Sequence, residues 1–480
     1  MISAMSQPGV MTAIDKGLAR ERALPSRPAP CAREPQSEHA SRTAQIRRAT
    51  DTLQALLREY AKRPRPIDVS FRQLVGPIPV NDLSHSIYPY PARLLRQIPR
   101  FFLHCEQIAL PGDVVVDPFC GSGTVLVEAR AAHMTGWGID RNPFARLLSE
   151  VKTTPLDHVR TWRAAADVLT RAKALRAGLI PDVVNVDLWF NQPVKRALGR
   201  LRRAIVEFDL SAEMRRFLLV SLAITAERCS LRDPRIPVPV RRQDWQLVAS
   251  HQGAAEVWRT FEEVARFVAA RLATIPSLEG VASVVEGEDA AQVDEVYKTR
   301  LANRLPRPTV ILTSPPYGAA QKYIRSSSLA LGWTGLATSA ELAILERGLI
   351  GREHLRLNEV TVLDCPNDSI AREVSLLASR DPVRAAIYAH YFRAMDAVLD
   401  NLIALLAPGG VLVLVAGSNI VTGCFLQTHL HLRELAVAHG MSPILELRDT
   451  IRGRVLLTKR ASTNAPLQDE TVHVLRKVSQ

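Results

Sequence analysis

The sequence predicts an α/β protein, a Rossmann-like mixed sheet interrupted by a helical insertion. Two observations carry this prediction. Residues 114–140 have the pattern of a buried strand, a Gly-rich turn, a helix and a second strand, and each strand ends in an acid. The same strand pattern resumes at about residue 281, after a mostly helical and basic stretch over 151–280.

The first 66 residues precede this sheet. Residues 1–40 hold five prolines, mixed charge and no hydrophobic periodicity, which predicts a disordered tail. Residues 42–61 are expected to form a helix, because Ile46, Leu53 and Leu57 fall on one face. A linker rich in Pro and Arg, residues 63–66, ends that helix.

The remaining elements are predicted in chain order. They are a strand at 114–116, a helix at 124–133, strands at 137–140, 281–285 and 309–312, a helix at 382–406, a strand at 411–415 and closing strands within 443–458. A polar stretch is expected at 335–380. We therefore expect the α/β domain in two parts, 67–150 and 281–480, with the insertion at 151–280 between them.

Composition favours a polyanionic partner. Of the 480 residues, 47% are hydrophobic and 23% are charged, as in ordinary globular proteins. Lys and Arg number 61 against 48 Asp and Glu, a net charge of +13, which favours nucleic acid. No apolar run reaches the ~20 residues that a membrane-spanning helix needs, so no membrane partner is expected.

Six cysteines are scattered along the chain. None of them forms a C-x-x-C pair, and no group of histidines accompanies them. This pattern excludes a zinc site and a disulfide framework. We therefore expect no metal and a reducing, cytoplasmic location.

The turn over residues 117–124, Asp-Pro-Phe-Cys-Gly-Ser-Gly-Thr, is the first candidate site. Gly121 and Gly123 allow a ligand to approach the backbone closely. No Lys stands at the end of the turn, which excludes a Walker phosphate loop. Asp140 ends the next strand, where an acid accepts hydrogen bonds from a ribose diol.

The turn over residues 313–318, Thr-Ser-Pro-Pro-Tyr-Gly, is the second candidate site. Its prolines stiffen the turn and remove N–H donors. Ser314 Oγ and the Pro315 carbonyl are placed to accept the two hydrogens of an exocyclic base amine, which frees the nitrogen lone pair. Tyr317 is expected to stack on a base flipped out of a duplex. The alternative is a purely structural turn.

Residues 117–124 resemble motif I of the S-adenosylmethionine-dependent amino-methyltransferases, which methylate exocyclic amines of nucleic-acid bases. Asp140 matches the acid of motif II, and residues 314–317 resemble motif IV. The resemblance covers about 84–150 and 281–460. It implies the Rossmann-like mixed sheet of a class I methyltransferase and S-adenosyl-L-methionine as cofactor.

The resemblance also implies roles for single residues. Residues 84–93 resemble motif X, which packs over the cofactor, and Tyr88, Tyr90 and Arg93 would line that pocket. Glu288 or Asp289 would reach the cofactor's adenine amino group. The implied catalytic residues are Ser314, Pro315, Pro316 and Tyr317, and the implied cofactor-binding residues are Asp117, Phe119, Gly121, Gly123, Thr124, Asp140, Asp289 and Tyr88. Alternatively, the aromatic residues of the 84–93 segment only anchor a loop on the core.

The motifs leave alternatives for the base that is methylated and for the nucleic acid, DNA or RNA, that contains it. Ser314 at its position is more typical of cytosine-N4 enzymes, whereas adenine-N6 enzymes mostly carry Asp or Asn there. Many cytosine-N4 enzymes, however, place motif IV before motif I, and this chain has the reverse order. We expect a DNA cytosine-N4 methyltransferase with a cognate restriction enzyme as partner. DNA adenine N6 and RNA guanine N2 or adenine N6 are the alternatives, and the intact motif IV argues against a non-catalytic binding module.

The insertion is the expected nucleic-acid interface. Residues 191–245 hold 12 Lys and Arg against 6 Asp and Glu, a net of +6 and about half of the whole excess. The expected contacts to double-stranded DNA are Lys195, Arg196, Arg200, Arg202 and Arg203. The alternative is a solvated helix face.

Overall fold

The computed structural model describes residues 36–318, 322–352, 355, 363–450 and 469–478. The chain divides into two compact units. The α/β unit comprises residues 29–155, 271–324 and 344–480, and the helical unit comprises 156–270 and 325–343 together with residues 1–28, which lie outside the described residues.

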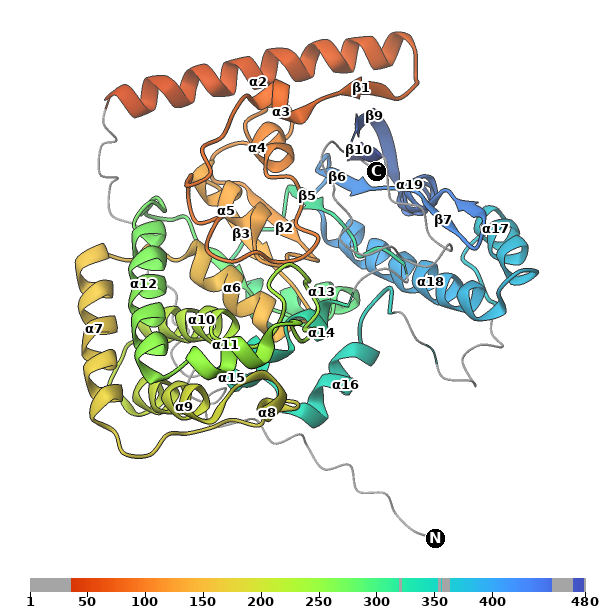
Figure 1. Ribbon diagram of the computed structural model, residues 1–480. Coiled ribbons are helices and arrows are strands. Elements are labelled where there is room, and N and C mark those ends of the chain that lie inside the picture. The colour runs from red at the N-terminus through yellow and green to blue at the C-terminus, as the bar shows by residue number, and fades with distance from the viewer. Residues whose placement is uncertain (1–35, 319–321, 353–354, 356–362, 451–468, 479–480) are drawn as a thin grey trace. The chain divides into compact units, whose positions relative to one another are not determined.

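An eight-stranded sheet forms the centre of the α/β unit (Figure 1). Its order is β1-β9-β10-β6-β5-β2-β3-β4. Strand β10 runs antiparallel to both β6 and β9, and every other pairing is parallel. The strands are β1 (Ile67–Val69), β2 (Val114–Asp117), β3 (Thr135–Gly138), β4 (Ser283–Val285), β5 (Val310–Thr313), β6 (Val411–Ala416), β9 (Met441–Thr450) and β10 (Asp469–Lys477).

The central strands are apolar because both faces of the sheet are covered. Strands β2, β5 and β6 are buried along their whole length. Alternate residues enter opposite cores, as the two-residue period of a strand requires: Val116 and Ile311 pack on one face, Val115 and Val310 on the other. The pairing of Val115 with Val310 confirms that the two candidate-site strands share one sheet.

Helices cover the two faces. The face of Val115 packs against α2 (Gln36–Lys62), α3 (Phe71–Val75), α4 (Gln97–Leu103) and α5 (Thr124–Ala131). The opposite face packs against α13 (Val293–Val296), α17 (Asp368–Ala378), α18 (Pro382–Leu405) and α19 (Thr428–Ala438). Also in this unit are α6 (Pro143–Thr153), the 3-10 helix η1 (Ala290–Gln292), the π-helix η2 (Tyr297–Leu301) and the hairpin β7 (Asn419–Val421) and β8 (Cys424–Leu426).

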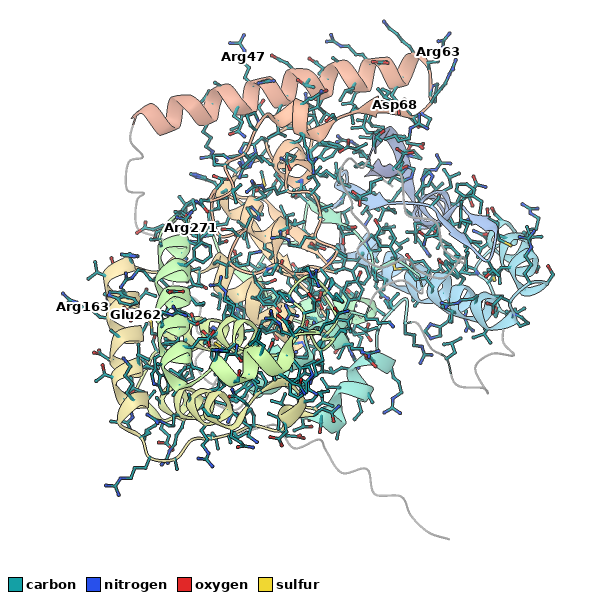
Figure 2. All side chains as sticks on the ribbon, in the orientation of Figure 1. Arg47, Arg63, Asp68, Arg163, Glu262 and Arg271 are labelled. Atoms are coloured by element: carbon teal, nitrogen blue, oxygen red, sulfur yellow. The ribbon has the colours of Figure 1, made fainter. Side chains whose placement is uncertain are left out.

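The outer face of α2 is basic. Leu53 and Ala49 are buried in the core, whereas Arg58 is exposed. Arg47 and Arg63 are also exposed and point away from the unit (Figure 2). The helix is therefore amphipathic, as its sequence period predicts.

The helical unit contains α7 (His158–Ala174), α8 (Val186–Trp189), α9 (Gln192–Glu207), α10 (Ala212–Arg228), α11 (Trp245–His251), most of α12 (Ala254–Leu272), α15 (Ser328–Thr334) and the start of α16 (Ser339–Arg347). The sequence did not predict that residues 325–343 join it. Trp333 of α15 is fully buried, and its ring meets Phe190 edge-on at 5.4 Å. The boundaries at 151 and 280 stay a prediction.

Some expected boundaries differ from the structure. Helix α2 begins at Gln36, so residues 36–40 were wrongly expected to be disordered. The polar stretch 335–380 contains α17, whose N-cap Asn367 accepts a hydrogen bond from the amide of Ile370. Residues 451–458 of the expected closing strands lie outside the described residues.

Within the described part of the chain, no helix is long and apolar enough to cross a membrane. Of the six cysteines, the five that the structure describes are unpaired.

Gly138 at the end of β3 tests the packing of the sheet. A Cβ there would lie 2.7 Å from Leu126 Cδ1 and 2.9 Å from Cys120 Sγ. We expect Gly138→Ala to lower the free energy of unfolding by about 1–3 kcal/mol, as overpacked cores do, measured by urea denaturation. Gly253→Ala is the control, because no described atom lies within 4 Å of its added Cβ. Equal stability of the two variants would contradict this packing.

Candidate functional site

A cavity lies at the carboxyl ends of β2, β3, β4 and β5. It holds about 900 Å³ of space free of protein atoms, open solvent included. The strand order runs outward in both directions from the neighbouring pair β2 and β5, and such a reversal is where open α/β sheets bind ligands (Figure 1). The lining includes the expected residues Asp117, Phe119, Gly121, Thr124, Asp140, Asp289, Ser314 and Pro316.

Asp117, the last residue of β2, is buried at the floor of this cavity. Its Oδ1 accepts hydrogen bonds from Thr313 Oγ1 at 2.7 Å and from the amide of Phe119 at 3.1 Å. Burial raises the pKa of this carboxyl to about 7, although both hydrogen bonds oppose the shift. A cationic ligand group placed here would restore the charged form, so the site fits a cation.

Asp140 lies two residues beyond β3 and accepts a hydrogen bond on each oxygen. The amide of Gly121 donates to Oδ2 at 2.9 Å, and the amide of Asn142 donates to Oδ1 at 2.8 Å. Burial raises the pKa of the Asp140 carboxyl against these bonds. Each oxygen keeps a further lone pair for a hydroxyl donor.

Gly123 supports the turn on the side that packs against α6. Its φ is +76°, and it is the N-cap of α5. A Cβ would lie 2.8 Å from Ser149 Oγ and 3.0 Å from Ser149 Cα. Close packing on α6 therefore requires glycine at this position, and Gly123 is not part of the described cavity lining.

Two acids follow β4 at the cavity. Asp289 accepts a hydrogen bond from the amide of Ala291 at 3.0 Å and thereby starts η1. Glu288 pairs with Arg146 at 2.8 Å, and its side chain is 66% exposed. Both residues line the cavity, and the less exposed Asp289 is the better placed acceptor.

The Pro-rich turn presents only part of itself to the cavity. Ser314 and Pro316 line it, whereas Pro315 and Tyr317 are absent from the described lining. Tyr317 is 9% exposed, and its hydroxyl donates to Glu470 Oε1 at 3.2 Å. The Tyr317 side chain is therefore largely buried, and its expected stacking on a flipped base stays a prediction.

The segment 84–93 lies over the Gly turn through Tyr90. The Tyr90 ring lies 3.4 Å from the Cβ that Gly121 lacks, and its hydroxyl accepts a hydrogen bond from Asn142 Nδ2 at 3.1 Å. Tyr88, the residue expected to bind the cofactor, is 4% exposed and packs edge-on against Phe144 at 5.2 Å. Tyr90 therefore lines the cavity and Tyr88 anchors the segment.

A buried charge network fixes the same segment. Glu128 of α5 is fully buried and accepts hydrogen bonds from His85 Nε2 at 2.7 Å and from Arg100 Nε at 2.8 Å. Burial alone would raise the pKa of the Glu128 carboxyl, but the hydrogen bond from His85 and the guanidinium of Arg100 outweigh it and lower the pKa to about 2. Arg93 of the cavity lining donates to the His85 carbonyl at 2.7 Å, so the network reaches the site.

The sequence did not single out several lining residues. Tyr323, Arg141 and residues 348–350 all contribute to the wall. Cys120 lies inside the quoted turn, but nothing in its sequence context marks its side chain as lining. No motif signals the others, because only the fold brings them to the strand ends.

The basic residues of α9 form internal contacts instead of a free surface. Lys195 pairs with Asp187, and Arg203 pairs with Glu207 at 2.9 Å. Arg200 donates to the carbonyl of Ala172 at 2.9 Å and lies over the Trp258 ring. Arg202 is 7% exposed. Of the five residues expected to contact DNA, Arg196 is exposed and the Arg203 side chain is 37% exposed, and the expected contacts with DNA stay a prediction.

A second polar cluster lies beside β9 and β10. Ligand-type atoms of His429, Glu446 and His473 lie within 4.8 Å of one another. Nδ1 of His429 is 3.0 Å from Nε2 of His473, and Glu446 is paired with Arg433 at 3.0 Å. The arginine supplies the charge that balances Glu446. The expected absence of a metal stays a prediction.

Comparisons with known proteins agree with this site. A family model described as "RMKL-like, methyltransferase domain" matches residues 89–174, which include the Gly turn and both of its acids. The Type II methyltransferase M.MvaI of Kocuria varians is 23% identical over 413 residues, 80% of this chain and 87% of that protein. The Type II methyltransferase M.MjaII of Methanocaldococcus jannaschii is 34% identical over 98 residues, 20% of this chain and 18% of that protein.

Among solved structures, the rRNA methyltransferase aviRa of Streptomyces viridochromogenes is 11% identical and has a TM-score of 0.30, with 85% of this chain and 96% of that chain covered. The sequence relatives confirm the resemblance to S-adenosylmethionine-dependent DNA methyltransferases. The class I methyltransferase fold is confirmed by the sheet, in which antiparallel β10 lies between β6 and β9.

The Glu128 network gives a stability test. Glu128→Gln removes the buried carboxylate that Arg100 and His85 share and leaves Arg100 with Asp82 alone, so we expect the free energy of unfolding at pH 7 to fall by about 3 kcal/mol. Folding lowers the pKa of Glu128, so its carboxylate contributes its full stabilisation of the folded state above the unfolded pKa of about 4.3. This contribution is lost as the pH falls towards about 2.

Denaturation from pH 7 to pH 2.5 checks this, and the difference between wild type and variant should shrink below pH 4.3. The exposed Glu106→Gln is the control. A difference that does not depend on pH would contradict the role of the charge.

Proposed function

We propose that this protein, an S-adenosylmethionine-dependent methyltransferase by fold and by sequence likeness, methylates an exocyclic amine of a base in DNA, foremost cytosine N4. One observation carries the proposal. A cavity at the strand ends brings the acids that suit the cofactor and the Ser of the Pro-rich turn into one lining. That combination suits methyl transfer to an amine.

The residues present fit the cofactor. Asp117 offers a buried carboxylate to the methionine ammonium, and Asp140 offers acceptor oxygens to the ribose hydroxyls. Asp289 lies where the adenine amino group is expected, and Phe119, Gly121 and Thr124 complete the wall. When bound, the cofactor supplies a methyl group on a sulfonium, a good leaving group.

Asp140→Ala tests the ribose role. We expect cofactor affinity, measured by isothermal titration calorimetry without nucleic acid, to weaken by about 1–3 kcal/mol, the cost of losing hydrogen bonds to a charged acceptor. The exposed Asp51→Ala should bind as wild type does. Unchanged affinity in folded Asp140→Ala protein would rule out this role for the residue.

Ser314 is the proposed amine acceptor. Its side chain is half-buried in the cavity lining. Ser314 Oγ and the Pro315 carbonyl would accept the two amine hydrogens, so that the nitrogen lone pair is directed at the methyl carbon. Ser314 and the Pro315 carbonyl would hold the amine while the bound cofactor supplies its methyl group, and the methylated amine would release its proton to water. No side chain needs to act as a base.

Ser314→Ala should slow methyl transfer about 10–1000-fold at saturating cofactor, because it removes a polar contact that strengthens towards the transition state. Single-turnover kinetics check this, with cofactor affinity expected to stay near the wild-type value. A wild-type rate in the variant would leave the turn with a structural role only.

The choice of DNA and of cytosine rests on two supports. The long alignment is to a Type II methyltransferase, and Ser314 occupies the position that resembles cytosine-N4 enzymes. Incubation of DNA and of RNA with labelled cofactor, followed by digestion and mass analysis, tests both. N4-methylcytosine in DNA is expected. N6-methyladenine, or label in RNA alone, would replace the proposal by the corresponding alternative.

We further propose one partner and one location for this protein. A cognate restriction enzyme is the expected functional partner, because the relatives are named Type II methyltransferases. A reducing, cytoplasmic location agrees with the unpaired state of the described cysteines.

A further inference from the structure

Helix α6 carries two polar side chains directly behind the Gly turn. Ser149 Oγ donates to the carbonyl of Gly121 at 2.8 Å. Lys152 Nζ donates to the carbonyl of Ser122 at 2.6 Å and lies 3.4 Å from Ser122 Oγ. Ser149 and Lys152 are three positions apart in the sequence, so they share one face of the helix.

These contacts complete the hydrogen bonding of the turn. The carbonyl of Cys120 accepts from the amide of Gly123 at 2.7 Å, and the carbonyl of Gly123 accepts from the amide of Val127 at 3.0 Å. With Ser149 and Lys152 holding the other two, all four carbonyls from Cys120 to Gly123 have partners within the protein.

The carbonyl directions determine an amide direction. The described peptide bonds are trans, so the N–H of a residue points opposite to the carbonyl of the residue before it. Because Ser149 holds the Gly121 carbonyl towards α6, the N–H of Ser122 points away from α6. A donor on that side suits the carboxylate of an amino-acid ligand.

Burying the amine of Lys152 in this position costs free energy of folding. The Lys152 side chain is 0% exposed, and within the described part of the chain its Nζ contacts a carbonyl and a hydroxyl but no carboxylate. Burial lowers the pKa of the Lys152 amine to about 7. An apolar side chain of similar length would fill the space without burying a charge, so stability alone does not account for a lysine.

Lys152 also contacts the other wall of the cavity. Its backbone carbonyl accepts a hydrogen bond from Ser84 Oγ at 2.7 Å. Ser84 begins the segment that supplies Tyr90 and Arg93 to the lining. One residue of α6 therefore supports both the Gly turn and the segment above it.

We infer that Lys152, together with Ser149, is a positioning residue for cofactor binding: the pair holds two carbonyls of the Gly turn against α6 and thereby fixes the turn in the shape that directs the N–H of Ser122 to the ligand. The inference rests on the proposed function. Neither side chain lines the cavity, so both act through the turn.

Lys152→Met is the decisive variant, because it keeps the length of the chain and removes the donor. We expect the Kd for S-adenosylmethionine, measured by calorimetry without nucleic acid, to rise about tenfold, the scale of one hydrogen bond from a charged donor. The thermal midpoint should stay equal or rise, because a buried amine is removed. Ser149→Ala should raise the Kd in the same direction, and Lys298→Met, at a 67% exposed lysine, is the matched control.

Each outcome decides one claim. If the wild-type protein does not bind S-adenosylmethionine, the proposed function fails. If it binds and Lys152→Met binds equally well, the inference fails alone. A Lys152→Met protein whose thermal midpoint falls while Ser149→Ala keeps wild-type affinity also overturns the inference, because Lys152 then serves folding and not the turn.

Discussion

The hydrogen bond between Thr313 and Asp117 joins the ends of the two central strands, and the site depends on it. It brings the residue before Ser314 against the acid that begins the Gly turn. Strands β2 and β5 are neighbours only because the chain leaves the sheet after β4 and returns on the other side of β2. The carboxyl ends of parallel strands meet at one edge, so residues nearly 200 positions apart in sequence share one cavity.

Buried polar groups around that edge are balanced locally. Asp140 is satisfied by two amides, Glu128 by His85 and Arg100, and the carbonyl of Ser122 by Lys152. For the two acids, loss of a partner would leave a buried group unpaired at a cost of about 1–3 kcal/mol. For the carbonyl of Ser122, removal of the buried Lys152 amine offsets the loss of its hydrogen bond.

The net positive charge of a segment did not predict which of its cationic side chains are exposed. The helical unit is basic, yet Arg200 covers the last carbonyls of α7 and Arg202 is buried beside the apolar stripe. Long cationic side chains pack their aliphatic stems on apolar surface, and here their N–H groups donate hydrogen bonds to backbone carbonyls. By contrast, Arg47 of α2 and Arg63, directly after that helix, point outward, in segments that the sequence marked only as a helix and a linker (Figure 2).

The sequence by itself determined the existence and chain order of the central strands β2, β3, β4, β5 and β6, the Gly turn and the position of the acids at strand ends, because hydrophobic period and glycine placement are local signals. Tertiary structure alone decided which aromatic residue faces the cavity: Tyr88 and Tyr90 lie two residues apart, and only packing against Phe144 separates their roles. It also decided that Tyr317 points to Glu470 and that α15 joins the helical unit. These outcomes depend on contacts between distant segments, which no local pattern encodes.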